Sequence, residues 1–108
     1  MVSLGSTKVL KEIVDTIIDS VHPEKIILFG SRARKDHSEH SDYDLLVIKR
    51  RLKNERKISR RIYQALFDQK IKRSVDIIVV DKDKLQIQME NPCLIYSWAL
   101  REGKVLYG

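Results

Sequence analysis

The chain begins with a predicted helix, because apolar residues recur at the three- and four-residue spacing of a single helix face. Thr7 can cap this helix, and its apolar stripe runs from Val9 to Val21. His22-Pro23 follows and ends it, since proline cannot continue the hydrogen-bonded ladder. One amphipathic helix is therefore predicted before the first strand.

A second helix is predicted from about Leu52 to Ile71. The positions expected to face inward are Ile58, Ile62, Ala65 and Leu66. Tyr63 and Phe67 are also four residues apart, a spacing typical of core positions, so no exposed aromatic platform is expected.

Strands are predicted where short apolar runs lie between turn residues. These runs are Ile26–Phe29, Asp42–Ile48 and Ser74–Val80, and Lys104–Tyr107 can add a last edge strand. Asp81 can start a short helix, and Asn91-Pro92 can start another that continues to Arg101. This order predicts an α/β fold, with a small mixed β-sheet and helices packed on it.

The end of the first predicted strand has the features of a phosphate-binding turn. The strand ends at Gly30, and the residues from Ser31 to Arg34 look like the first turn of a short helix, whose unpaired N–H groups suit an anion. Gly30 would let a phosphate approach the backbone, and the Ser31 hydroxyl could donate to a phosphate oxygen. The alternative is an ordinary Gly-Ser turn.

Three acidic residues stand near the starts of the next two strands. Asp42 and Asp44 share one face of their strand under two-residue alternation, and Asp76 lies near the start of the run Ser74–Val80. Neighbouring carboxylates repel unless a cation lies between them, and oxygen ligands of this kind suit Mg²⁺. We expect the three acids to meet at one end of the sheet. The alternatives are a solvated Asp-x-Asp and an Asp at an exposed strand edge.

These residues resemble the motifs of the minimal nucleotidyltransferases, the smallest members of the DNA polymerase beta-like superfamily. The resemblance covers nearly the whole length, and the segment 30–34, Gly-Ser-Arg-Ala-Arg, is similar to the phosphate-binding signature of that family. The chain departs from many members at Lys35, where they carry glycine.

The resemblance implies a polymerase-beta-like nucleotidyltransferase fold, with residues 1–108 as a single minimal nucleotidyltransferase domain. It implies ATP as substrate and two Mg²⁺ ions. The implied catalytic and metal-binding residues are Asp42, Asp44 and Asp76. The implied phosphate-binding residues are Gly30, Ser31, Arg32 and Arg34.

A protein partner is also implied by the resemblance. Relatives often pair with a small helical HEPN protein as antitoxin and toxin, and several are understood to transfer AMP to a tyrosine of that partner. The implied function is therefore Mg²⁺-dependent transfer of AMP to a hydroxyl of a HEPN toxin. The alternative is a catalytically silent module that binds nucleotide or partner and neutralises a toxin by complex formation.

Length and hydropathy limit what else the chain can be. Its 108 residues leave no room for a separate acceptor-binding domain, so the acceptor or a partner is expected to supply part of the site. No apolar run approaches membrane-spanning length, and the N-terminal residues do not follow the pattern of a signal peptide. A cytoplasmic location without membrane contact is the expectation.

The net charge of +6 is distributed unevenly. The segment from Lys49 to Arg73 contains eleven Lys or Arg residues and only two acidic residues, Glu55 and Asp68, so its net charge is +9. The remaining residues together carry −3. Such a segment can bind nucleic acid, dock an acidic protein or steer nucleotide toward the site. It can also be a solvated helix face.

Overall fold

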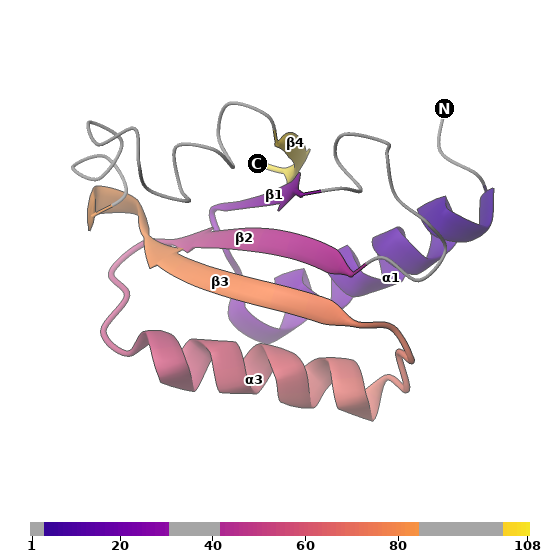
Figure 1. Cartoon of the computed structure of the whole chain (residues 1–108). Coiled ribbons are helices and arrows are strands. Elements are labelled where there is room, and N and C mark those ends of the chain that lie inside the picture. The colour runs from indigo at the N-terminus through magenta and orange to yellow at the C-terminus, as the bar shows by residue number, and fades with distance from the viewer. Residues whose placement is uncertain (1–3, 31–41, 85–102) are drawn as a thin grey trace.

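The structure is a computed structural model that describes residues 4–30, 42–84 and 103–108 (Figure 1). The elements in chain order are α1 (Leu4–Val21), β1 (Lys25–Phe29), β2 (Tyr43–Lys49), α3 (Glu55–Asp68), β3 (Val75–Asp81) and β4 (Lys104–Tyr107). The two long helices and the strands occur in the predicted order. The helices predicted at 31–34 and 91–101 lie outside the described residues.

The described strands form one mixed sheet in the order β3-β2-β1-β4. β2 pairs with β3 in parallel, whereas β1 pairs with β2 and with β4 in antiparallel fashion. The predicted α/β class with a small mixed sheet is confirmed, and β4 is an edge strand as expected.

Both long helices cover the same face of this sheet (Figure 1). Strand residues at alternating positions point toward them and form the main core. This core contains Ile13, Ile17 and Val21 of α1, Ile62 and Leu66 of α3, and Tyr43, Leu45 and Val47 of β2, all of them buried. The other face of the sheet carries a smaller apolar cluster, which contains Ile27, Leu46, Ile48 and Val80 with Phe29 and Ile78 partly buried beside them.

The first helix is longer than predicted at its N-terminus. It begins at Leu4, three residues before the Thr7 that was expected to cap it. Its C-terminus is where the sequence places it. His22 takes up the left-handed conformation with φ of +49° and donates its N–H to the Ile18 carbonyl at 3.0 Å. The Lys49 ammonium of β2 donates to the Val21 carbonyl at 2.8 Å, so a positive charge interacts with the negative end of the helix dipole.

The second helix is shorter than the predicted 52–71, because side chains and a turn stop it at both ends. The N–H of Leu52 donates to the Asp81 carboxylate at 3.0 Å, and Asn54 caps the helix by accepting the Lys57 N–H at 3.1 Å. At the other end, Lys70 adopts φ of +57°. The Lys70 N–H reaches the Phe67 carbonyl and the Ile71 N–H reaches the Leu66 carbonyl, the hydrogen-bond pattern of a Schellman cap.

The core positions predicted for α3 are correct for four residues and wrong for two. Ile62 and Leu66 are buried, and Ile58 and Ala65 are half-buried, as predicted. Tyr63 and Phe67 were expected inside but are 42% and 78% exposed. They follow Ile62 and Leu66 by one residue, so they are turned by about 100° away from the core.

The Tyr63 side chain lies over the edge of β3 instead. Its hydroxyl accepts the N–H of Ile77 at 2.9 Å. Because β3 is at the edge of the sheet formed by the described strands, this hydrogen bond satisfies a backbone donor that has no strand partner among them.

No helix in the described ranges is both long enough and apolar enough to cross a membrane.

Candidate active site

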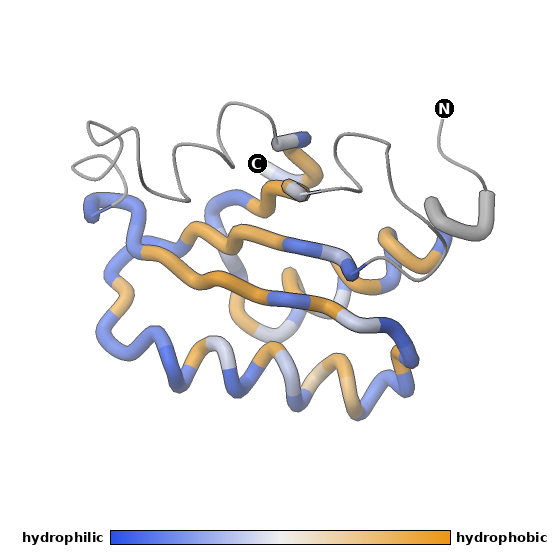
Figure 2. Tube along the Cα trace, viewed as in Figure 1, coloured by the Kyte–Doolittle hydropathy of each residue, from blue (hydrophilic) through white to orange (hydrophobic). Residues whose placement is uncertain are grey.

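Two of the predicted acids lie side by side at the start of the parallel strand pair. Asp44 of β2 and Asp76 of β3 are register partners, so their Cα atoms face each other across strands that are about 4.8 Å apart. Figure 2 shows a polar segment in each of two otherwise apolar strands. Asp44 is half-buried and Asp76 is exposed. This pairing confirms that the two carboxylates belong to one face of the sheet.

The buried Tyr43 fixes which face that is. Tyr43 is 2% exposed and belongs to the core under the helices, so its neighbours Asp42 and Asp44 are directed to the opposite side. The Tyr43 N–H donates to the Ser74 carbonyl at 2.9 Å, which ties the start of β2 to the start of β3. Asp42 lies just before β2 and is exposed. The alternation Asp-Tyr-Asp therefore places a buried anchor between two acids that face away from the core.

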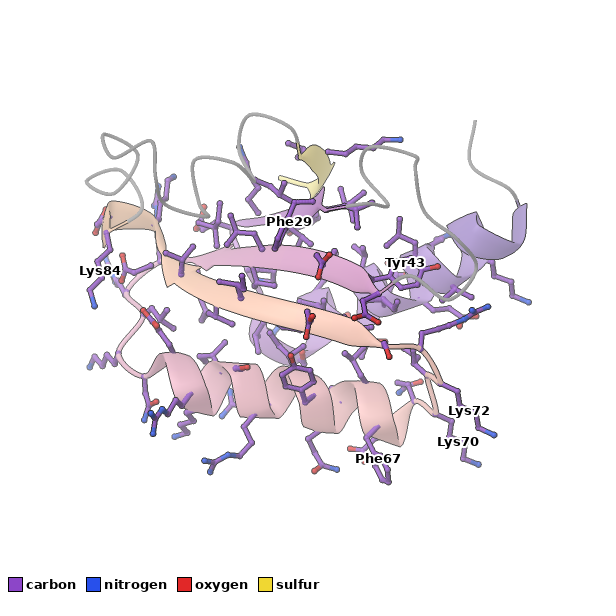
Figure 3. The ribbon with its side chains drawn as sticks, in the orientation of Figure 1. Phe29, Tyr43, Phe67, Lys70, Lys72 and Lys84 are labelled. Carbon is purple, nitrogen blue, oxygen red and sulfur yellow. The ribbon has the colours of Figure 1, made fainter. Side chains whose placement is uncertain are left out.

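The end of β1 meets the same corner of the sheet. β1 runs antiparallel to β2, and Phe29, its last residue, is in register with Asp44. Phe29, Asp44 and Asp76 thus form one row across three strands. Phe29 is partly buried on the apolar cluster of this face, and Figure 3 shows it on that side of the sheet. Phe29 was predicted only as a residue of the first strand, although its position directly before Gly30 could have indicated a place in the site.

Gly30 lies directly against the Asp44 carboxylate. A Cβ built on Gly30 would collide with the Asp44 side chain, and the φ of Gly30 is +75°, in the region that favours glycine. Only glycine satisfies both conditions. Gly30, the one described residue of the predicted phosphate turn, is therefore a neighbour in space of Asp44, one of the predicted metal ligands.

Asp44 and Asp76 share a face and an end of the sheet, and Asp42 lies just before β2, but the three described acids do not form a closed metal site. Within residues 4–30, 42–84 and 103–108, no group of three or more His, Cys, Asp or Glu side chains is placed so that it could hold a metal ion. The aligned pair of Asp44 and Asp76 nevertheless fits a divalent cation chemically. Two carboxylates on adjacent strands offer hard oxygen donors, and a cation between them would relieve their repulsion. Ser31, Arg32 and Arg34 lie outside the described residues, and their phosphate-binding role stays a prediction.

Comparison with known proteins is consistent with this arrangement. A model of the family described as polymerase beta, nucleotidyltransferase matches residues 11–108. A crystal structure from Sulfolobus solfataricus, provisionally assigned as a nucleotidyltransferase, matches with a TM-score of 0.62 and 26% sequence identity. The match covers 91% of this chain and 76% of the other. No curated protein matches. Since the family model spans nearly the whole sequence and its fold is the one observed, the chain belongs to the polymerase beta nucleotidyltransferase family.

Proposed function

We propose that this chain transfers AMP from ATP to a hydroxyl group in the presence of Mg²⁺. One observation supports the proposal above the others: Gly30 lies against the carboxylate of Asp44, and Asp44 is in register with Asp76. A backbone able to approach a phosphate and two carboxylates able to hold a cation therefore occupy one corner of a sheet in a chain of this family.

Each part has a separate task in the proposed reaction. Asp44 and Asp76, with Asp42 beside them, would hold Mg²⁺, which supplies Lewis-acid stabilisation of phosphate charge and lowers the pKa of a bound hydroxyl. The turn at Gly30 would hold the β- and γ-phosphates, so that the α-phosphorus faces the acceptor. The acceptor hydroxyl would give its proton to solvent as its oxygen bonds to the α-phosphorus, the bond from that phosphorus to the bridging oxygen would break, and pyrophosphate would leave. Positioning and charge compensation dominate such a reaction.

The acceptor in this proposal is a tyrosine of a HEPN-type toxin, and the chain acts as its antitoxin. Support comes from the resemblance of the Gly30-Ser31 and Asp42, Asp44 motifs to those of the minimal nucleotidyltransferases.

The experiment combines the purified chain with ATP labelled at the α-phosphate, Mg²⁺ and the product of the neighbouring gene. We expect label on a tyrosine of that product. Asp44→Asn and Asp76→Asn should each abolish transfer, whereas Asp19→Asn, which neutralises an exposed carboxylate on α1, should not. Calorimetric titration with Mg²⁺ and ATP gives a second readout, since both site variants should lose metal binding. Transfer that survives in both site variants would contradict the assignment.

A catalytically silent module that binds nucleotide or partner is the second candidate, since only Asp44 and Asp76 of the three acids are register partners. It predicts that toxin neutralisation persists unchanged in Asp44→Asn and that no label is transferred by the unmodified chain. The proposed enzyme predicts the opposite on both counts, so one pair of measurements separates the two.

A further inference from the structure

A single flank of α3 carries both cations and exposed aromatic rings. Arg56, Arg60, Tyr63 and Phe67 are separated by four, three and four residues, the spacing that keeps side chains on one line along a helix. We call these four residues the α3 stripe. It extends about 16 Å at 1.5 Å per residue. All four residues are exposed.

The position of this stripe is fixed by Tyr63. Its hydroxyl accepts the N–H of Ile77, so at Tyr63 the stripe lies beside the edge of β3. The acids Asp44 and Asp76 belong to the other face of the sheet, away from both helices. The α3 stripe is therefore a second surface, separate from the candidate active site.

The cations of the stripe are available for a ligand. Within the described residues, Arg56 and Arg60 form no ion pair with a carboxylate, and no acid interrupts the stripe. The two acids of the segment occupy other positions: Glu55 precedes the stripe, and Asp68 accepts a hydrogen bond from Gln64 at 3.0 Å. Further cations follow the stripe at the C-terminal end of α3, where Figure 3 shows Lys70 and Lys72 beside Phe67.

The exposed rings indicate what kind of ligand fits. Phe67 is 78% exposed and projects away from the sheet (Figure 3), one helical turn after the 42% exposed Tyr63. A single nucleic acid strand offers phosphates for the cations and a flat base at every step for the rings. Acidic peptides offer the charges without the regular flat faces, and a duplex keeps its bases stacked inside. Of these classes, a single strand matches the stripe in both respects.

We propose that the α3 stripe binds single-stranded nucleic acid, with Arg56 and Arg60 on phosphates and Phe67 stacked on a base. RNA and single-stranded DNA share this chemistry. The surface does not depend on nucleotide chemistry at Asp44 and Asp76, so it can be tested separately from the proposed transfer reaction.

The test is fluorescence anisotropy of the full chain with labelled oligonucleotides of about 16 nucleotides, the upper site size of a single-strand binding fold. Mixed-sequence RNA, single-stranded DNA and duplex DNA are compared between about 50 and 200 mM KCl. The charge variant is Arg56→Gln/Arg60→Gln. Its matched control, Lys57→Gln/Arg61→Gln, removes the same charge from exposed positions on the other flank of α3.

We expect single strands to bind more tightly than the duplex, and Arg56→Gln/Arg60→Gln to lower the slope of log K against log salt by about 1.4. The control should change the slope less. Phe67→Ala should weaken single-strand binding about five- to 100-fold, with little effect on folding because the ring is exposed. Asp44→Asn/Asp76→Asn should leave this binding unchanged.

Three results would overturn the proposal. The first is an equal decrease of the salt slope in the two charge variants, which would mean that the strand is attracted by the basic segment 49–73 as a whole. The second is unchanged binding in Phe67→Ala or preference for the duplex. The third is tighter binding of polyglutamate than of either single strand, which would identify the surface as a site for acidic proteins. Preference between RNA and single-stranded DNA decides which strand is the natural one.

Discussion

At the scale of single residues, Gly30 is the position of the candidate site where a substitution is expected to do most damage. Gly30→Ala should destabilise the protein by at least about 1 kcal/mol, because φ of +75° is unfavourable for a residue with a Cβ. It should also abolish the proposed transfer, because the new methyl group would displace the Asp44 carboxylate. Urea unfolding measures the first effect, and the label-transfer assay measures the second.

A double-mutant cycle separates the backbone strain of Gly30→Ala from its collision with the Asp44 carboxylate. In an Asp44→Ala background the carboxylate that the new Cβ would strike is gone, so Gly30→Ala should cost only its backbone strain. The coupling between the two positions should be at least about 0.5 kcal/mol. Additive effects would show that Gly30 and Asp44 do not touch.

Asp81 is expected to make the stability of the protein sensitive to acid. The pKa of its carboxyl is lowered from 3.8, chiefly by the hydrogen bond from the Asp83 N–H, with the Leu52 N–H adding to the effect and partial burial opposing it. A lowered folded-state pKa stabilises the protein above the unfolded value of 3.8, and the stabilisation is lost as the pH falls through the folded pKa.

Asp81→Asn should therefore reduce stability at neutral pH and flatten its decline below about pH 4. Urea midpoints measured from neutral pH to about pH 3 check both effects. Asp83→Asn is the control, because Asp83 is exposed and its hydrogen bond to the Asp81 carboxylate comes from its backbone N–H. A decline as steep in Asp81→Asn as in the unmodified chain would rule out this role.

At the scale of elements, the cap of α3 contains a residue that is not suited to its conformation. Lys70 holds φ of +57° at the position where helices usually have glycine. Lys70→Gly should stabilise the protein by about 0.5–1 kcal/mol, since relief of the left-handed strain exceeds the entropy that glycine costs. Lys72→Gly, at an exposed residue without positive φ, should give no gain. Thermal or urea unfolding of the two variants and the unmodified chain measures the difference in the free energy of unfolding.

The order of helices and strands could be predicted from the sequence, whereas the side of α3 that faces the core could not. Runs such as Ile26–Phe29 and the helical stripe ending at Val21 have a period that identifies a strand or a helix locally. On α3, however, Ile62, Tyr63, Leu66 and Phe67 form a broad apolar arc, and either side of it could face the core. Contacts with α1 and β3 select Ile62 and Leu66. These contacts are between residues far apart in the sequence.

Helix ends depend on partners that a local pattern does not contain. The predicted start at Leu52 is wrong because Asn54 takes an extended conformation and caps the helix before Glu55, while Asp81 of β3 holds the Leu52 N–H outside it. The predicted end at Ile71 is wrong because Lys70 adopts a left-handed turn. Of the candidate site, only the shared face of Asp42 and Asp44 is predicted by two-residue alternation within one strand. The register of Asp44 with Asp76, and the row with Phe29, depend on how β1, β2 and β3 pair.

At the scale of the whole molecule, ATP with Mg²⁺ should raise the melting temperature. A ligand that binds only the folded state stabilises it by about 2.7 kcal/mol at a concentration 100 times its dissociation constant. Asp44→Asn and Asp76→Asn should lose most of this shift, and Asp19→Asn should retain it. A shift of equal size in all four proteins would place nucleotide binding elsewhere.

The row of Phe29, Asp44 and Asp76 has a consequence for how the protein behaves when its stability is low. Its members come from three strands, so the row exists only when β1, β2 and β3 are paired. Folding and ligand capture are thus a single linked equilibrium. Nucleotide would act as a folding partner, and a variant too unstable to fold alone could be rescued by its own substrate.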